Sequence, residues 1–259
     1  MANPQIHSTA IIEKGVELAD DVVIGPYSIV GEGARIGRNT RLMSHVVIDG
    51  LTHIGEDNVF HPFCVIGGPP QDLTYQNEPT KVVIGDRNVF RESCTVHRGT
   101  LKDKGVTTIG NDNFVMAFCH FAHDNTIGNH LIMANQTSLA GHVTVGDYVV
   151  LGGQAAVTQH CRVGDYGFIG AGSILRRDLP PYMCAKEFSQ VSGPNLVGLK
   201  RRNLSKEDVR VICELYKLMY LSNQTTEKAL VAIEERFADN EYSKRFVDFV
   251  RKTKVGIQR

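Results

Sequence analysis

The feature that most constrains this chain is a six-residue repeat of apolar positions. From residue 109 to residue 175 every sixth residue is apolar, although the chain is only 42% hydrophobic. These positions are Ile109, Val115, Phe121, Ile127, Met133, Leu139, Val145, Leu151, Val157, Val163, Ile169 and Leu175. A strict period of six predicts a parallel β-helix, in which three short strands form one triangular coil and coils stack at about 4.7–4.9 Å. Residues eighteen apart should therefore lie directly above one another.

The repeat starts near the N-terminus and is interrupted twice. It begins at Ile6, lapses over 67–83 and again over 97–108, and restarts at Ile109 one residue out of phase. Segments expelled from a repeat scaffold are expected to form surface loops, which often carry binding and catalytic residues. We therefore expect an all-β parallel β-helix over 1–185 with these two segments as inserted loops.

A different pattern follows the β-helix. The apolar period ends in the segment Asp178-Leu-Pro-Pro-Tyr, where two prolines are expected to stop strand pairing. Apolar residues then recur at helical spacing, with Ser205 and Asp208 as a capping pair at the start. Helices are predicted over 205–220, 226–238 and 241–252. We expect a C-terminal α-helical domain over 186–259 that covers the end of the prism.

Composition and shape indicate the kind of protein this is. Lys+Arg and Asp+Glu balance at 28 each, so a nucleic-acid partner is not indicated. The six cysteines show no CxxC pair, which is typical of reduced thiols in a cytoplasmic protein. Neither a signal peptide nor a membrane-spanning segment is expected. The flat faces of a triangular prism suit threefold packing, so we predict a homotrimer with clefts between its subunits.

The eighteen-residue rule places polar residues in two adjacent columns. His123, Gly141 and Gln159 form one column, and Asp124, His142 and His160 form the column beside it. An imidazole that titrates near neutrality suits a general base, and a carboxylate beside it can hold its tautomer. A glycine has no side chain to block its backbone N–H, which could donate to an oxyanion. His97 and His120 lie on nearby coils.

Clustered histidines also allow a second interpretation. The spacing His120-x-x-His123 is close enough for two zinc ligands, and a trimer could assemble a three-histidine site across its interface. A zinc enzyme of the γ-type carbonic anhydrase class therefore stays open at this point. A purely structural β-helix is a third possibility, although polar faces without clustered histidines would be expected of it.

Several motifs resemble those of one family. They are Ile84-Gly-Asp-Arg-Asn, Val96-His-Arg-Gly-Thr, His120-Phe-Ala-His-Asp, Leu139-Ala-Gly-His-Val and Gly198-Leu-Lys-Arg-Arg. In these segments, and over essentially its whole length, the chain resembles the UDP-N-acetylglucosamine O-acyltransferases that begin lipid A synthesis in Gram-negative bacteria. The resemblance implies a left-handed β-helix, a homotrimer, and transfer of an R-3-hydroxyacyl group from acyl carrier protein to the sugar 3-hydroxyl of UDP-N-acetylglucosamine. It implies no metal and no cofactor beyond the phosphopantetheine of the carrier protein.

The resemblance also implies roles for individual residues. His123 matches the general base, Asp124 its supporting acid, and Gly141 the backbone amide of the oxyanion site. Residues that match groups around the sugar or in the active cleft are Asp72, His97, His120, His142 and Gln159. Residues that match groups near the nucleotide phosphates are Asn195, Arg201 and Arg202. The basic run that includes the two arginines could equally meet the acidic surface of the carrier protein.

Three positions bear on specificity. Thr74 and Val197 stand where members of the family carry a lysine and an acid, so charges that those members direct toward the substrate are missing here. Ala171 occupies a position that is glycine in long-chain enzymes, and its extra methyl group predicts an acyl chain of roughly 10–14 carbons. A UDP-sugar N-acyltransferase stays an alternative, because a histidine base suits a 3-amino acceptor as well. Such enzymes usually have a large N-terminal uridine-binding domain, for which a repeat that starts at Ile6 leaves no room.

Overall fold

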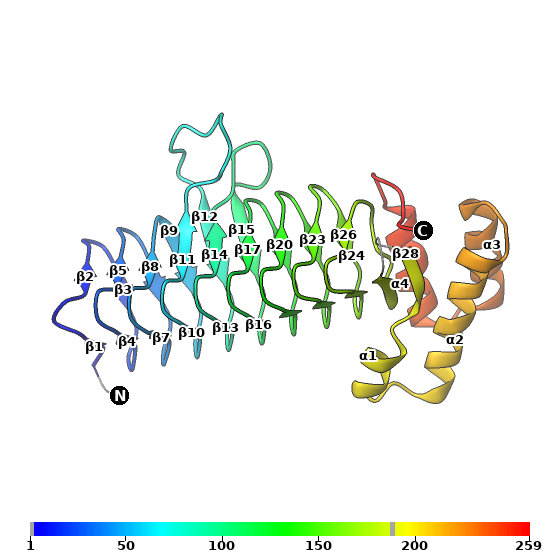
Figure 1. Ribbon diagram of the computed structural model, residues 1–259, viewed down its shortest axis with the longest axis horizontal. Coiled ribbons are helices and arrows are strands. Elements are labelled where there is room, and N and C mark those ends of the chain that lie inside the picture. The colour runs from blue at the N-terminus through cyan, green and yellow to red at the C-terminus, as the bar shows by residue number, and fades with distance from the viewer. Residues whose placement is uncertain (1–2, 187–189) are drawn as a thin grey trace.

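The computed structural model describes residues 3–186 and 190–259, which form a prism of short parallel strands followed by helices at its C-terminal end (Figure 1). Three sheets make the faces of the prism. Sheet A contains β1 (Gln5–Ile6), β4 (Val23–Ile24), β7 (Arg41–Leu42), β10 (Val59–Phe60), β13 (Val89–Phe90), β16 (Phe114–Val115), β19 (Ile132–Met133), β22 (Val150–Leu151), β25 (Phe168–Ile169), β27 (Met183–Lys186) and β28 (Gln190–Pro194). Sheet B contains β2 (Ile11–Ile12), β5 (Ile29–Val30), β8 (Val47–Ile48), β11 (Val65–Gly68), β14 (Thr95–His97), β17 (His120–Phe121), β20 (Ser138–Leu139), β23 (Ala156–Val157) and β26 (Ile174–Leu175). Sheet C contains β3 (Glu17–Leu18), β6 (Arg35–Ile36), β9 (Leu51–Ile54), β12 (Lys81–Ile84), β15 (Val106–Ile109), β18 (Thr126–Ile127), β21 (Thr144–Val145) and β24 (Arg162–Val163).

The repeat of eighteen residues is the register of these sheets. His120 pairs with Ser138 in sheet B, and Ile132 pairs with Val150 in sheet A. Beyond the first coil, the second residue of each two-residue strand is buried inside the prism, as the fully buried Phe121 illustrates. Because apolar burial is the main favourable term in folding, this inward column explains why every sixth position must be apolar.

The corners of the prism require backbone in the left-handed region. Asp124, His142 and His160 have φ values of 59°, 62° and 64° at successive turns of one corner. Asn, Asp and His tolerate this conformation better than most side chains. The corner between sheets B and C can therefore carry the polar residues that the interior of the prism excludes.

Two loops leave the prism on the same side (Figure 1). The first lies between the end of β11 at Gly68 and the start of β12 at Lys81, and the second lies between β14 and β15, over residues 98–105. The apolar period lapses over 67–83 and 97–108, but the flanking strands extend a few residues into both segments, so the loops are shorter than these lapses. We call the second segment the 98–105 loop.

Strand pairing continues past the two prolines, contrary to the prediction that it stops there. β27 pairs in parallel with β25, with Cys184 opposite Phe168, and β28 then pairs antiparallel with β27. The prolines precede β27, whose four residues retain their N–H groups, so sheet A gains two more strands.

Helices complete the chain. They are α1 (Leu196–Arg201), α2 (Lys206–Tyr216), a π-helical turn η1 (Lys217–Leu221), α3 (Thr226–Arg236) and α4 (Glu241–Arg251). Ser205 caps α2 by accepting a hydrogen bond from the Asp208 N–H at 3.1 Å, as the sequence predicts. The sequence did not predict α1, which is short and follows directly on β28. Among the described residues, none of the helices is both long and apolar enough to span a bilayer.

Candidate active site

His123 and Asp124 form a hydrogen-bonded pair at the corner between sheets B and C. The Nδ1 atom of His123 lies 2.9 Å from Oδ2 of Asp124, just after strand β17. The Asp124 side chain is completely buried, and the His123 side chain is 13% exposed. A carboxylate only accepts hydrogen bonds, so Nδ1 carries the proton and Nε2 of the neutral ring keeps a lone pair. His123 is therefore arranged as a general base.

Asp124 is held in place by the 98–105 loop. The backbone N–H of Thr100 donates to both carboxylate oxygens, at 3.0 and 3.1 Å, and its hydroxyl donates to Oδ2 at 2.7 Å. A buried carboxylate is costly unless it is hydrogen-bonded, and these donors together with His123 satisfy it. The sequence did not predict this role of Thr100, because the apolar period says nothing about how an inserted loop folds back.

Gly141 lies one coil away, directly against the His123 ring. A Cβ atom added to Gly141 would come within 2.7 Å of Cε1 and 2.8 Å of Nε2, so only glycine fits. The eighteen-residue rule predicts this neighbourhood, and the His142 N–H donates to the His123 carbonyl at 3.0 Å. In the described part of the chain the Ala140 and His142 N–H groups donate to the neighbouring coils, whereas the Gly141 N–H makes no such bond. A free N–H thus lies beside the base, where it can stabilise an oxyanion.

His142 and His160 follow Asp124 at the same corner. The rings of His142 and His160 stack with centroids 4.5 Å apart, and His142 meets His123 edge-on at 5.0 Å. The Nδ1 atom of His142 lies 3.0 Å from Oδ2 of Asp103, a residue of the 98–105 loop that sequence analysis also missed. Gln159 follows strand β23 and is exposed beside His160.

His97 and His120 form a second pair of imidazoles nearby. Their ring centroids lie 4.9 Å apart at 80°, and Nδ1 of His120 is bonded to the Thr95 hydroxyl at 2.7 Å. Burial, followed by the nearby charges of His120, His123 and Arg98, lowers the pKa of His97 to about 4. Burial also lowers the pKa of His120. Both rings are therefore neutral at physiological pH, and the buried Nδ1 of His97 has no partner among the described residues.

Asp72 lies on the first inserted loop and is tied to the 98–105 loop. Its carboxylate accepts from Lys102 Nζ at 2.6 Å and from the Thr74 N–H and hydroxyl, both at 2.9 Å. The Lys102 bond, followed by those from Thr74, holds the pKa of Asp72 well below its usual range. Thr74 thus supports Asp72, and Lys102 brings a positive charge from the neighbouring loop.

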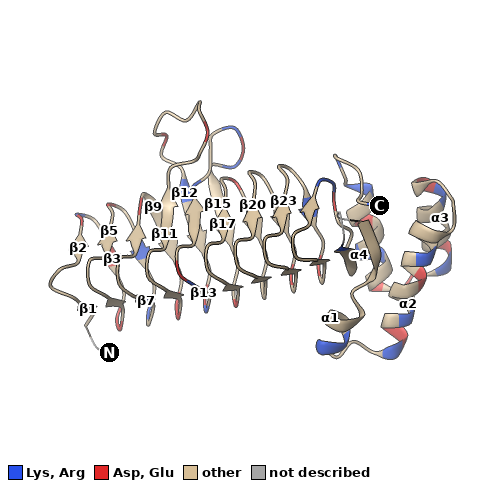
Figure 2. Cartoon of the chain, viewed as in Figure 1, with Lys and Arg blue, Asp and Glu red and all other residues tan. Residues whose placement is uncertain are grey.

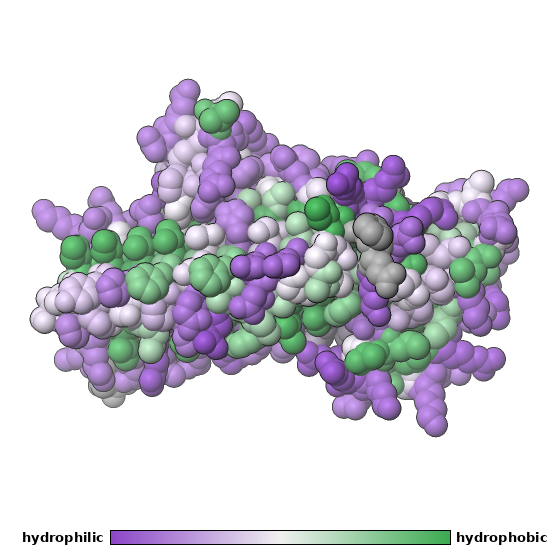
Figure 3. All heavy atoms as spheres, viewed as in Figure 1, coloured by the Kyte–Doolittle hydropathy of each residue, from purple (hydrophilic) through white to green (hydrophobic). Residues whose placement is uncertain are grey.

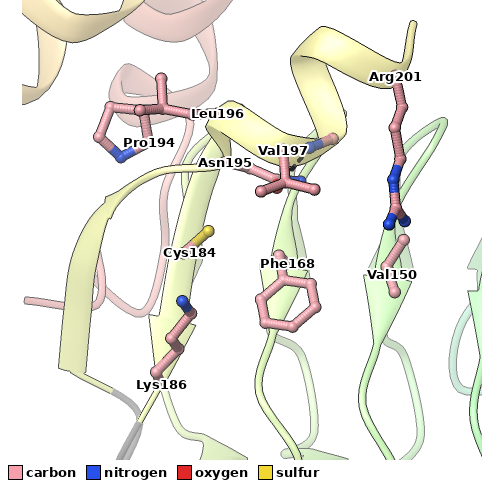
Figure 4. Close-up of a pocket in the computed structure, with 10 residues that line it drawn as sticks. Val150, Phe168, Cys184, Lys186, Pro194, Asn195, Leu196, Val197 and Arg201 are labelled. Carbon is pink, nitrogen blue, oxygen red and sulfur yellow. Dashed lines mark hydrogen bonds between the residues drawn. The ribbon is translucent and has the colours of Figure 1, made fainter.

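A separate group of predicted residues lies on sheet A beside α1. Figure 4 shows a pocket there, of about 360 Å³, whose lining includes Val150, Phe168, Lys186, Asn195 and Arg201. None of the site histidines lines this pocket. Within one chain, the predicted histidines therefore do not share this pocket with Asn195 and Arg201.

The polar residues of this second group have structural partners of their own. The Asn195 side chain caps α1 by accepting from the Gly198 N–H at 3.0 Å and donates to the Tyr166 carbonyl at 2.8 Å. The Arg202 guanidinium lies over the Tyr148 ring at 4.6 Å and anchors the end of α1 on the prism. Arg201 belongs to the last turn of α1 and is exposed. Figure 2 shows basic residues on this short helix.

Ala171, the predicted gauge of acyl length, lies at the corner after strand β25. Its side chain is exposed, and its backbone N lies against the position that a Cβ on Gly152 would take. The position is therefore open to a ligand or to a second chain.

The zinc interpretation can be tested against the donor atoms. In the described part of the chain, His123, Asp124 and His142 have potential ligand atoms within 4.8 Å of one another. Both ring Nδ1 atoms are hydrogen-bonded to carboxylates, so each ring offers only Nε2 to a metal, and Asp124 is held by Thr100. This group contains two histidines rather than three. The donor set fits hydrogen-bonded acid–base residues better than a three-histidine zinc centre.

A hexapeptide-repeat prism with a carboxylate-supported histidine at one corner defines the class of β-helical acyltransferases. Residues 3–38 match the bacterial transferase hexapeptide model, and residues 178–258 match domain 2 of the UDP-N-acetylglucosamine O-acyltransferase model. The acyl-(acyl-carrier-protein)–UDP-N-acetylglucosamine O-acyltransferase of Thermodesulfovibrio yellowstonii is 44% identical over 98% of this chain and 99% of its own. The enzyme of the same name from Saccharophagus degradans is 46% identical over 98% and 99%.

Solved structures agree with these relatives. The UDP-N-acetylglucosamine acyltransferase of Francisella novicida superposes with a TM-score of 0.96 at 37% identity, over 98% of this chain and 94% of that one. The enzyme of Campylobacter jejuni gives 0.93 at 35% identity, over 98% and 99%. The chain belongs to the UDP-N-acetylglucosamine O-acyltransferase family. The predicted fold, a left-handed parallel β-helix followed by helices, is confirmed.

Proposed function

We propose that this chain transfers an R-3-hydroxyacyl group from acyl carrier protein to the 3-hydroxyl of UDP-N-acetylglucosamine, the first step of lipid A synthesis. Family membership supports the reaction and its two substrates. The observation that carries the mechanism is the His123 ring, held by Asp124 at Nδ1 and lying against Gly141 at Nε2.

The reaction then proceeds by acid–base catalysis. His123 Nε2 takes the proton of the sugar 3-hydroxyl while its oxygen attacks the thioester carbonyl carbon. The Gly141 N–H donates to the negative charge that develops on the carbonyl oxygen. The carbon–sulfur bond breaks, the ester forms, and the imidazolium returns its proton to the departing thiol. Asp124 accepts from Nδ1 throughout and stabilises the positive charge on the ring.

The neighbouring polar residues bind the sugar in this proposal. His97 and His120 are neutral, so each ring has one nitrogen that donates a hydrogen bond and one that accepts. Asp72 and His142 complete this group from the loop and the adjacent coil, and Gln159 lies on the next coil. No resident cofactor or metal is required, because the donor brings its own phosphopantetheine.

The active site is proposed to lie between subunits of a homotrimer. The histidines occupy the corner of sheets B and C, whereas Arg201 and Lys186 line a pocket on sheet A. Threefold packing can set the corner of one subunit against the pocket of the next.

The outward residues of the first four strands of sheet B are all apolar, and Figure 3 shows a row of hydrophobic residues along these coils. They are Ile11, Ile29, Val47 and Val65.

An exposed apolar row of this kind on a sheet face is typical of a protein interface. Light scattering should give a mass about three times the 28.6 kDa of one chain. A monomer at micromolar concentration would contradict the trimer.

In such a trimer, Arg201 and Lys186 would bind the nucleotide phosphates, for which a guanidinium is well shaped. Asn195 contributes by fixing the start of α1, because both ends of its amide are already bonded. Arg202 contributes by anchoring the other end of the helix on Tyr148. The exposed basic residues of α1 are also available to the acidic surface of the carrier protein.

The acyl length is proposed to be 10–14 carbons because of Ala171. Its exposed methyl group would shorten an acyl groove that glycine leaves open. Substituting Ala171→Gly should shift preference toward longer thioesters, measured with a panel of acyl carrier protein thioesters. An unchanged preference, or a strong preference of the unaltered enzyme for 16 carbons or more, would reject this assignment.

Mass spectrometry of the product tests the proposed reaction. UDP-N-acetylglucosamine and mixed acyl carrier protein thioesters should give one acylated sugar nucleotide whose acyl group is released by mild alkali, as an ester requires. Preference for a 3-amino acceptor and an alkali-stable amide product would favour the N-acyltransferase instead.

A further inference from the structure

His142 has a carboxylate partner from the 98–105 loop. Its Nδ1 lies 3.0 Å from Oδ2 of Asp103 and 3.9 Å from Oδ2 of Asp124. The first distance is that of a hydrogen bond, and the second is too long for one. The hydrogen-bonding partner of His142 is therefore Asp103.

Asp124 cannot easily serve both rings. Its Oδ2 accepts from His123 and from the Thr100 hydroxyl, and the Thr100 N–H approaches both oxygens. These donors occupy both acceptor positions of Oδ2, the oxygen that lies nearest His142, on a fully buried carboxylate. Each of the two histidines at the corner thus has a carboxylate of its own, and the second one comes from outside the prism.

The position of Asp103 is itself well supported. Its neighbour Lys102 is bonded to Asp72 on the other inserted loop, so consecutive residues contact two groups proposed to bind the sugar. The His142 side chain is only 11% exposed and is stacked on His160. Packing therefore restricts the orientation of the ring, and the hydrogen bond to Asp103 decides which of its two nitrogens carries the proton.

We propose that Asp103 is a positioning residue for the acceptor sugar, which acts by fixing the Nδ1–H tautomer of His142. A carboxylate at Nδ1 requires a proton there, which leaves Nε2 of the neutral ring as an acceptor for a sugar hydroxyl or amide N–H. This inference rests on the proposed function, because it assigns His142 to the sugar. Loss of the Asp103 carboxylate should then weaken sugar binding more than it slows the chemical step.

Steady-state kinetics test the effect on the sugar. Asp103→Ala should raise the KM for UDP-N-acetylglucosamine about tenfold and change kcat by less than about twofold. The isosteric Asp103→Asn keeps a weaker acceptor and should recover part of the loss. Lys104→Ala, in the same loop, is the matched control, because its ammonium group donates to the hydroxyl of Thr126 on strand β18 at 2.9 Å and its loss should leave KM unchanged.

Nitrogen NMR of histidine-labelled protein tests the tautomer without reference to turnover. At about pH 8 most imidazoles are neutral, and the His142 resonances can be assigned with a His142→Gln variant. The unaltered protein should show the proton on Nδ1, and Asp103→Ala should move it wholly or partly to Nε2. Lys104→Ala should not change the spectrum of this ring.

The outcomes separate this inference from the proposed function. Retention of the Nδ1–H tautomer in Asp103→Ala would overturn it, as would an equal rise of KM in Lys104→Ala. A changed tautomer with an unchanged KM would also overturn it, because Asp103 would then not serve the sugar. The proposed function fails by a different result, namely full turnover after loss of His123.

Discussion

The histidine corner and the pocket beside α1 are built in opposite ways. At the corner, the base, its carboxylate and the glycine lie on two stacked coils whose register is set by the apolar repeat. The pocket is formed where sheet A, the β27–β28 hairpin and a six-residue helix meet, and its polar residues also hold that junction together. The base, its carboxylate and the glycine are therefore expected to determine the chemical step, and the pocket to determine nucleotide binding. Substitutions in the two regions should have different kinetic signatures.

The largest expected effect is at the base. His123→Ala should lower kcat by about 10²–10⁴, because the proton of the acceptor hydroxyl then has no partner. Single-turnover measurements with saturating substrates isolate this step from binding. Near-normal turnover would show that His123 is not the general base. It would also contradict the proposed difference between the two regions.

A large effect is also expected from one methyl group at the glycine. Gly141→Ala places its Cβ within 2.7 Å of the His123 ring, so the ring must shift, and kcat should fall about 100-fold. Gly153→Ala is the control, because its Cβ would meet only the Asn135 carbonyl oxygen, at 3.5 Å. Equal losses in the two variants would show that the β-helix, rather than the oxyanion site, is sensitive to the added methyl group.

Loss of an arginine in the pocket should give the opposite signature. Arg201→Ala is expected to raise the KM for UDP-N-acetylglucosamine about tenfold with little change in kcat, because a phosphate contact is made equally in the ground and transition states. A fall of kcat with constant KM would show that Arg201 acts in the chemical step. It would contradict the proposal that the pocket affects binding alone.

His97 provides a prediction about pH. Its pKa is near 4 in the folded protein, and in the unfolded chain it returns to about 6.5, the ordinary value for a histidine. Between these values the unfolded chain binds the proton more readily, so stability should fall as pH drops from about 6.5 to about 4, by at most about 3 kcal/mol. Urea unfolding at fixed protein concentration measures this loss, and His97→Gln should reduce it. An identical pH profile in the variant would contradict the assignment.

The smallest expected effect is that of metal removal. Because the group of possible ligands at the corner offers two histidines rather than three, and its carboxylate is already bonded to Thr100 and His123, activity after dialysis against a chelator should stay within about twofold of the untreated enzyme. Zinc-dependent activity that is lost with the chelator and restored by zinc would revive the carbonic anhydrase interpretation.

The constant spacing of eighteen residues between stacked positions explains why the residues of the corner could be predicted from the sequence. An eighteen-residue step relates His123 to Gly141 and Asp124 to His142, and the repeat leaves little freedom in that register. The 98–105 loop has no such rule. Thr100 belongs to a motif that carries the family resemblance, but no spacing rule indicates that it holds Asp124.

The same reasoning explains the errors at the C-terminal end. Prolines are poor strand residues, but those at 180 and 181 lie before β27 and not within it, so the sheet continues. The pocket depends on this hairpin and on α1, neither of which has a periodic signature. Asn195 and Arg201 were identified by resemblance alone, and their proximity to each other became apparent only in three dimensions.

The central claim is that the corner of one subunit and the pocket of another make one active site. Trimers formed from a mixture of His123→Ala and Arg201→Ala chains test it directly, with kcat/KM measured at low UDP-N-acetylglucosamine. Random mixing of equal amounts should restore about a quarter of normal activity, because that share of interfaces pairs an intact corner with an intact pocket. If each site lies within a single chain, the mixture would be no more active than the average of the two variants alone.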